Sequence, residues 1–300
     1  MNLEKLIRDI KPNLNIKSLK SYINNINIIL KETNSDDLSI FKNKKIIIDF
    51  LDKKKSFLTK RNYLNSIIVL LQHDNQKYND EIIYYQNIRD GYNQEYKNNK
   101  QNNKKNNKEI ANWLTMKQIN EIIDHLKQDL SNEQNLIWYF MLNFWVEFPL
   151  RNDLQHTEII SKKKYDSLLD EELKIKNYFV LDKEPFISIS QYKTFKRYGI
   201  KKIIMNQKMK DILLLYLPKN KTKYLLYNIK NKSAMGTDNI THSFNKLFQK
   251  YYPEKKISTT MIRHIVLSEK FGHNLLEQKK YCDIMGHDLN TQTNIYIKHD

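Results

Sequence analysis

The sequence predicts a mainly α-helical protein of two domains, the second of which carries a small antiparallel β-sheet. Apolar residues recur at helical spacing along most of the 300-residue chain. The stretch from residue 178 to 205 is rich in strand signals, and within it residues 186–192 alternate apolar and polar with the period of a strand. A tract of Asn, Lys and Gln from residue 97 to 108 has the composition of a linker or a solvated helix end. The length suits two domains of ordinary size, with a boundary near residue 108.

The first domain, residues 1–107, is predicted to be entirely helical. One helix carries an apolar stripe with i, i+3, i+4, i+7 spacing, formed by Leu19, Tyr22, Ile23, Ile26 and Leu30. A second helix is expected over residues 43–53. A third begins near Thr59 as its N-cap, and a fourth starts near Asp80 and continues into the polar tract.

The second domain, residues 108–300, begins with a helix over residues 117–130 for which Thr115 is the expected N-cap. The apolar helix that follows stops at Pro149, because proline cannot continue a helix. Short strands are expected at 178–181, 186–192 and 200–205, with a turn at Tyr198 and Gly199. Helices then resume at 209–216, 238–251, 260–271 and 275–285, with a short one around Tyr296.

Composition excludes several classes of protein. The only cysteine is Cys282, so no intramolecular disulfide can form and an intracellular, reducing compartment is expected, with cytoplasm and nucleus both open. The five glycines are too far apart for a dinucleotide-binding fingerprint or a P-loop, so no nucleotide is expected. No other cofactor and no metal are expected. The N-terminus lacks the apolar stretch of a signal peptide, and no apolar run is long enough to span a membrane.

The formal net charge of +17 favours a polyanionic partner. Nucleic acid is the first expectation and an anionic membrane surface the second. Because the chain is rich in Lys, Asn and Ile, as an AT-rich genome would encode, part of this charge has a simpler explanation. Both predicted domains are basic, which suits a protein that holds a duplex from two sides.

Five residues with basic, imidazole or phenol side chains occur in a characteristic order. Arg151 follows the apolar helix within P-L-R-N-D-L, and Lys193 lies in Y-K-T at the end of the alternating strand. Arg263 stands beside His264 in T-T-M-I-R-H, and His287 follows Gly286 twenty-four residues later. Tyr296 comes nine residues after His287.

This order resembles the tyrosine recombinase (phage-integrase-like) family. There an Arg follows an apolar helix, a Lys lies on a β-hairpin, and H-x-x-R-H, L-G-H and a Tyr nine residues on complete the pattern. The resemblance covers residues 110–300 by motif. It extends to the first domain by architecture, as a helical core-binding domain of a C-shaped clamp on double-stranded DNA.

The resemblance implies a role for each residue. Arg151 and Arg263 would clamp the phosphate, Lys193 would be the hairpin lysine, His287 would donate to a nonbridging oxygen, and Tyr296 would be the nucleophile. Elementary chemistry is consistent with these roles. A phenol needs neighbouring cations to ionise, paired guanidinium groups match a phosphate, and a lysine can protonate the leaving 5′ oxygen.

One position departs from the family pattern. Three residues before Arg263 the family usually has His, whereas this chain has Thr260, so Thr260 and His264 are assisting candidates only. Thr260 would also serve as a helix N-cap. The expected activity is site-specific DNA recombination or integration through a 3′-phosphotyrosyl intermediate. The alternatives are a type IB topoisomerase, a resolvase, or a catalytically impaired DNA-binding relative.

The expected assembly is a tetramer on DNA, because strand exchange through a Holliday junction needs two DNA segments. The sequence ends four residues after Tyr296, whereas many relatives carry a further segment that docks on a neighbouring protomer. The mode of assembly is therefore open. So are the DNA target and the setting, whether a virus, a mobile element, a plasmid or a chromosome.

Overall fold

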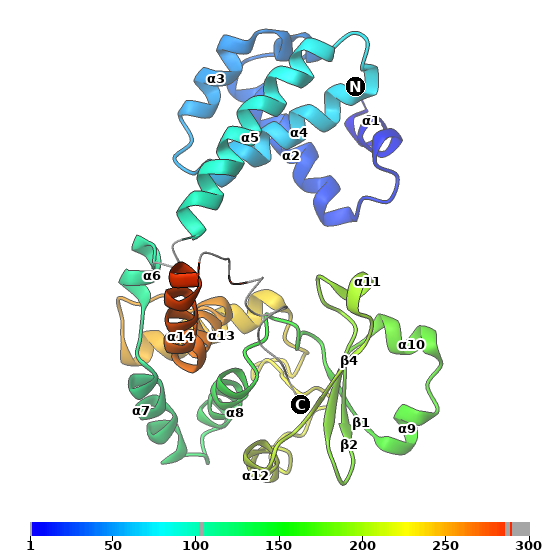
Figure 1. Cartoon of the computed structure of the whole chain (residues 1–300). Coiled ribbons are helices and arrows are strands. Elements are labelled where there is room, and N and C mark those ends of the chain that lie inside the picture. Colours follow the sequence, from blue (N-terminus) through cyan, green and yellow to red (C-terminus); the bar gives the residue numbers. More distant parts are fainter. Residues whose placement is uncertain (1, 102–104, 286–288, 290–300) are drawn as a thin grey trace. The chain divides into compact units, whose positions relative to one another are not determined.

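The computed structural model of the chain describes residues 2–101, 105–285 and 289. It is mainly helical, with one small four-stranded sheet (Figure 1). The chain divides into two compact units, unit 1 (Met1–Lys104) and unit 2 (Lys105–Asp300), where the sequence predicted a boundary near residue 108. Within the described ranges, every helix is too short or too polar to cross a bilayer.

Unit 1 is built from helices around one apolar core. They are α1 (Leu3–Ile10), α2 (Ile16–Glu32), α3 (Lys44–Asp52), α4 (Phe57–Leu71) and α5 (Asn79–Gln101), with 3-10 turns at Leu38–Lys42 and Gln72–Asp74. Helix α4 is central and is buried on all sides in its second half, where the Asn25 amide of α2 donates to the hydroxyl of Ser66. It begins two residues before the expected Thr59, and α1 was not predicted.

The polar tract between the two units is helical at both of its described ends. Helix α5 continues to Gln101, and α6 (Asn107–Asn112) begins soon after. A capping box starts α6: the Asn106 side chain accepts from the Glu109 backbone N–H, and the Glu109 carboxylate accepts from the Asn106 N–H. Reciprocal capping explains how so polar a segment forms a helix.

Unit 2 packs its helices around one buried helix, α8 (Glu133–Glu147). The helices against it are α7 (Met116–Lys127), α12 (Gln207–Tyr216), α13 (Thr237–Tyr251) and α14 (Thr259–Met285). Phe140 of α8 stacks on Tyr216 with ring centres 4.4 Å apart, and Trp145 meets Phe244 edge-on at 5.2 Å. The expected cap of α7 is confirmed, because the Thr115 side chain accepts from the Gln118 N–H.

Helix α14 differs from the two helices that the sequence predicted. It runs without a break from Thr259 to Met285. Gly272, which falls between the two predicted helices, lies inside it with helical backbone. The Ile262 N–H bonds to the Ser258 carbonyl, so the helix starts before Thr260, which lies in the first turn and is not the N-cap. The helix expected around Tyr296 falls outside the described residues.

The sheet has the order β1 (Glu158–Ser161), β2 (Tyr178–Leu181), β3 (Phe186–Ile189), β4 (Lys201–Ile204). The prediction of a small antiparallel sheet is confirmed for the three predicted strands, β2 to β4. It is wrong for the sheet as a whole, because an unpredicted strand, β1, pairs with β2 in parallel and makes the sheet mixed. A crossover through α9 (Lys162–Asp166) and α10 (Asp170–Ile175) returns the chain to run in the same direction. The remaining pairs, β2–β3 and β3–β4, are antiparallel.

Both faces of the sheet are covered within unit 2 (Figure 1). Phe179, Ile187 and Ile189 join the main core around α8, while the opposite face packs under Tyr165 of α9. Residues 178–180 of β2 and all of β3 are buried, and these two strands are apolar on both sides. The one polar side chain within them, Ser188, is bonded to the Tyr165 hydroxyl at 3.0 Å.

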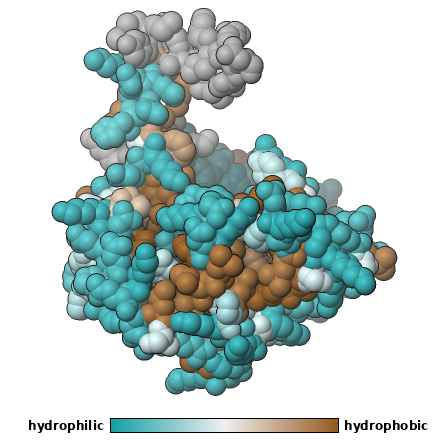
Figure 2. Space-filling view, turned by 90° about the horizontal axis from the view of Figure 1, so that it is seen from below, coloured by the Kyte–Doolittle hydropathy of each residue, from teal (hydrophilic) through white to brown (hydrophobic). Residues whose placement is uncertain are grey.

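One side of the molecule gathers apolar side chains at its surface, as the view from below shows (Figure 2). Helix α12 lies on this side in Figure 1 and turns Ile212, Leu213 and Tyr216 to the core. Its intervening residues Leu214 and Leu215 face solvent, with 74% and 45% of their surface exposed. Residues 212–217 are apolar without interruption, so they cover all sides of the helix, and only one side can face the core.

Candidate functional site

The candidate site begins where α8 ends. Pro149 prevents the helix from continuing, and the Phe148 N–H makes the last helical bond to the Phe144 carbonyl. The Trp145 indole N–H donates to the Leu150 carbonyl at 3.1 Å and so holds the departing chain against the helix. Arg151 therefore leaves the core at a fixed point and reaches solvent.

Asn152 ties this loop to two helices that come much later in the sequence. Its amide nitrogen donates to the Thr237 carbonyl at 2.9 Å and to the Thr241 hydroxyl at 2.8 Å, both in α13. Its amide oxygen accepts from the Thr259 hydroxyl at 2.7 Å, in the first turn of α14. One carboxamide thus sets the position of Arg151 relative to the helix that carries Arg263.

Arg263 reaches back to the same loop from α14. Its Nε donates to the Pro149 carbonyl at 3.0 Å, which fixes the guanidinium plane beside the start of the loop. Arg151 and Arg263 lie close enough for their charges to act on each other and on Asp153. The structure therefore brings together the two arginines that the sequence predicted.

The charges of three basic side chains act on the carboxylate of Asp153. Burial lowers the pKa of Arg263, and the like charge of Arg151 lowers it further, while Asp153 acts in the opposite direction. Burial also raises the pKa of Asp153, although Arg151, Lys201 and Arg263 all oppose that shift. Three cations thus face one half-buried carboxylate, and the excess of positive charge is suited to a phosphate.

The hairpin between β3 and β4 contributes a different lysine from the one predicted. Lys193 lies in the exposed turn after β3, before the short helix α11 (Phe195–Tyr198). Lys201 instead starts β4 opposite Ile189, its charge acts on Asp153, and its Nζ is 4.3 Å from the centre of the Tyr192 ring. Among the lysines of this hairpin, Lys201 is thus the one whose charge acts on Asp153, the carboxylate that both arginines also influence.

The two assisting candidates have different surroundings. Thr260 is exposed and lies three residues before Arg263, which places it on the same side of α14. The imidazole Nδ1 of His264 lies 2.8 Å from a carboxylate oxygen of Glu109 in α6. His264 therefore fixes α6 to α14 and is directed away from the arginine pair.

His287 and Tyr296 lie outside the described residues, so the structure gives them no position. Helix α14 carries the chain from Arg263 to Met285, one residue before the Gly-His motif. Among the described residues, no three His, Cys, Asp or Glu side chains are arranged to hold a metal ion.

Sequence reasoning missed Asn152, Asp153 and Lys201. Asn152 and Asp153 follow Arg151 directly in the sequence, and this adjacency could have marked them as candidate site residues. Lys201 required the register of the hairpin, because its pairing with Ile189 puts it on the face of the sheet that meets the core. From the sequence alone, Lys193 is preferred because it ends the alternating strand and precedes Thr194, with Lys196 as the nearby competitor.

Comparison of the chain with models of known protein families finds no match, and a search of curated proteins finds none either. We therefore take the site from its geometry and from the order of its residues.

Proposed function

We propose that this chain cuts and rejoins DNA by the chemistry of the tyrosine recombinases, with Tyr296 as nucleophile and a 3′-phosphotyrosyl intermediate. The observation that carries the proposal is the convergence of Arg151 and Arg263, far apart in sequence, around a single carboxylate. Two positioned guanidinium groups with an excess of positive charge suit a phosphodiester and its five-coordinate transition state. The mainly helical fold with a small sheet is compatible with the catalytic domain of that family.

In the proposed reaction the Tyr296 oxygen attacks the phosphorus while the bond from phosphorus to the 5′ oxygen breaks. The tyrosine proton leaves to a base, and the 5′ oxygen receives a proton from a general acid, so that charge and atoms balance. Arg151, Arg263 and His287 would stabilise the nonbridging oxygens. The reverse attack by a 5′ hydroxyl restores the strand without ATP, because the phosphotyrosine retains the energy of the diester.

Two lysines can fill the role of general acid. Lys193 is a candidate for this role because of the resemblance to the family. Lys201 is a candidate because its charge acts on Asp153, as do the charges of both arginines. The two residues are separated by the hairpin, so one variant of each tests them independently.

We further propose that both units contact the duplex and that four copies assemble on two DNA segments for strand exchange. The basic composition of both halves of the chain supports the first statement. The second follows from the chemistry of exchange between two duplexes.

The test uses the full chain and duplexes selected for binding from a randomised pool, each carrying a nick at successive positions. Cleavage beside a nick releases a short fragment and traps the covalent intermediate. We expect a protein–DNA adduct that survives denaturation and that is absent with Tyr296→Phe. Arg151→Lys and Arg263→Lys should each slow adduct formation roughly 10²–10³-fold, the usual effect of removing one preorganised donor.

The outcomes separate the alternatives. Specific binding without an adduct on any nicked duplex contradicts the proposed chemistry and favours a binding-only relative, which the threonine at position 260 would explain. Relaxation of supercoiled DNA without exchange between two duplexes would favour a type IB topoisomerase.

A further inference from the structure

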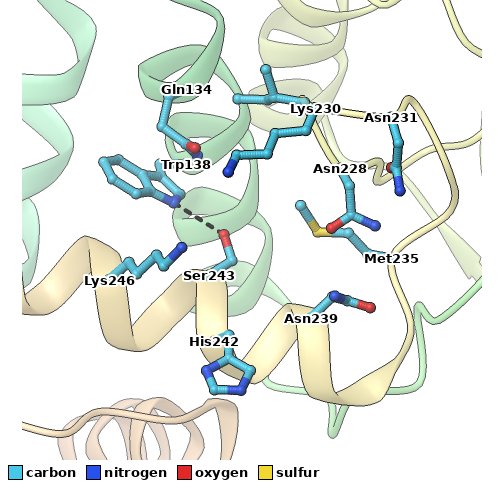
Figure 3. A pocket seen from close by; sticks show the side chains of 11 residues that line it. Gln134, Trp138, Asn228, Lys230, Asn231, Met235, Asn239, His242, Ser243 and Lys246 are labelled. Carbon is cyan, nitrogen blue, oxygen red and sulfur yellow. Dashed lines mark hydrogen bonds between the residues drawn. The ribbon is translucent and has the colours of Figure 1, made fainter.

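A second polar hollow lies in unit 2, at the opposite end of α8 from the arginine pair. It has a volume of about 350 Å³ and is formed by the first half of α8, by α13 and by the loop that joins Tyr227 to α13 (Figure 3). Its residues are Gln134, Trp138, Asn228, Ile229, Lys230, Asn231, Met235, Asn239, His242, Ser243 and Lys246. Trp138 lies nine residues before Glu147, the last residue of α8, which is about 14 Å along the helix axis. Neither Arg151 nor Arg263 lines the hollow.

Positive charge dominates this hollow. Lys230 extends from the loop and Lys246 from α13, both toward the ring of Trp138 (Figure 3). Within the described part of the chain neither lysine has an ion-pair partner, and no carboxylate lines the hollow. The nearby Glu133 carboxylate is already engaged by Lys232 at 2.6 Å and by the Tyr227 hydroxyl at 2.7 Å. The hollow therefore favours an anion.

Several polar groups of the hollow are already bonded and serve to shape it. The Trp138 indole N–H donates to the Ser243 hydroxyl at 3.0 Å (Figure 3), and Asn228 and Asn231 bond to Ser233 within the loop. The Asn239 side-chain oxygen accepts from the Gly236 N–H, which holds its amide at the start of α13. The walls are therefore preformed.

The groups that remain for a ligand come mainly from one side of α13. Asn239, His242 and Lys246 follow one another at i, i+3 and i+7, so they lie on one face of the helix, and all three are exposed. No hydrogen bond of the described residues uses the Asn239 amide N–H₂ or the His242 ring. An exposed row of amide, imidazole and ammonium groups on one helix face is the chemistry that reads base edges.

We infer that this hollow is a DNA contact that confers sequence preference, in which Lys230 and Lys246 hold a backbone phosphate while Asn239 and His242 face base edges. The inference rests on the proposed function for duplex DNA as the partner. Arginines that clamp a phosphate carry no sequence information, so a protein that acts at a specific site needs a separate surface for base contacts. An extended partner also fits better than a small ligand, because the functional groups are exposed.

The test is a selection of bound sequences from a pool of duplexes with a randomised central segment. Wild type should enrich duplexes that share a short block of preferred bases. Asn239→Ala and His242→Ala should weaken that preference, with a loss of discrimination between bases of roughly tenfold at the affected positions. Asn239→Asp keeps the oxygen that accepts from the Gly236 N–H but loses the N–H₂ donor. A loss of base preference in this variant would therefore come from the missing donor and not from a disturbed start of α13. Asn274→Ala, in exposed α14, is the matched control and should retain the block.

The lysines require a different measurement. Lys230→Ala and Lys246→Ala should weaken binding to selected and unselected duplexes by similar factors, and each should reduce the slope of log K against log salt by about one. Lys163→Ala, an exposed lysine of α9, is the charge-matched control. Unchanged affinity and slope in both lysine variants would overturn the phosphate contact.

Failure of this inference differs from failure of the proposed function. If the Asn239 and His242 variants enrich the same block as wild type while wild type still forms the covalent adduct, the inference is wrong and the chemistry stands. If the block depends on these residues but no adduct forms, the inference stands and the proposed chemistry is wrong. A chain that binds no duplex contradicts both.

Discussion

At the residue scale, the candidate site depends on the carboxylate of Asp153 between two arginines. Its raised pKa shows that loss of water on burial outweighs the attraction of three nearby cations. A carboxylate whose pKa is higher in the folded than in the unfolded state binds its proton more tightly when folded. Its contribution to stability is therefore present at low pH and is lost as the pH rises through the folded-state pKa.

Asp153→Asn should therefore stabilise the protein at neutral pH, because the amide keeps the shape of the side chain and cannot ionise. The difference from wild type should disappear at about pH 3, below the ordinary pKa of Asp, where both side chains are neutral. Urea unfolding of both proteins across this range measures the effect. A variant that is less stable at neutral pH would show that the ionised carboxylate holds the arginines in place.

The choice between Lys193 and Lys201 as general acid is also a matter of single residues. A substrate with sulfur in place of the 5′ bridging oxygen has a leaving group that needs no proton, because a thiol is far more acidic than an alcohol. The alanine variant of the general acid should cleave normal DNA slowly and the sulfur-substituted DNA at nearly the wild-type rate. We expect this rescue for Lys201→Ala; rescue of Lys193→Ala alone would contradict the structural assignment.

At the element scale, the arginine pair depends on how the loop after α8 is fixed to α13 and α14. Asn152 makes three hydrogen bonds, and Thr259, with 3% of its surface exposed, has its hydroxyl satisfied by one of them. The loop has no regular secondary structure of its own between Pro149 and Gln155. Its shape is set by these side-chain bonds together with local turns, in which the Gln155 N–H donates to the Asn152 carbonyl and the Thr157 N–H to the Leu154 carbonyl.

Asn152→Ala should lower the free energy of unfolding by about 1–3 kcal/mol, because it leaves buried polar groups without partners. It should also slow DNA cleavage, since Arg151 would lose its fixed position relative to Arg263. Asn15→Ala is the control: it removes the N-cap of α2 in unit 1, where the side chain accepts from the Ser18 N–H, and should cost about 1 kcal/mol without a specific loss of cleavage. Equal loss of cleavage in both variants would contradict a positioning role for Asn152.

Elements with strong periodicity were predictable from the sequence, and those that depend on distant contacts were not. The helix after Thr115 and strand β2 follow from capping and from an apolar run. Strand β1 is four residues long and pairs in parallel only because two short helices return the chain, which no local pattern reveals. The continuity of α14 through Gly272 was not predicted either, because a glycine inside a helical pattern favours a break, whereas the structure keeps it in the helix.

For the candidate site, residue order predicted that Arg151 and Arg263 would meet, because the motif places both. It did not predict Asp153 as the group between them or Lys201 as the hairpin lysine whose charge acts on Asp153. Those assignments need the pairing register of the hairpin and the burial of the loop, both of which arise from tertiary structure.

At the scale of the whole molecule, the net charge of +17 should make DNA binding depend strongly on salt. A chain that neutralises about six phosphates releases their counterions, so log K should fall with log salt at a slope of about −5. Titration of the full chain with an unselected duplex at several salt concentrations measures the slope. A slope near zero would contradict binding through the phosphate backbone.

The measurement that tests the central claim most directly is the identification of the residue that carries DNA after cleavage. The adduct is digested with nuclease and protease, and the modified peptide is sequenced by mass spectrometry. A nucleotide attached through its 3′ phosphate to the Tyr296 oxygen is the result that we predict. Attachment to a different residue, or through a 5′ phosphate, would contradict the account of a phosphate held by Arg151 and Arg263 and attacked by Tyr296.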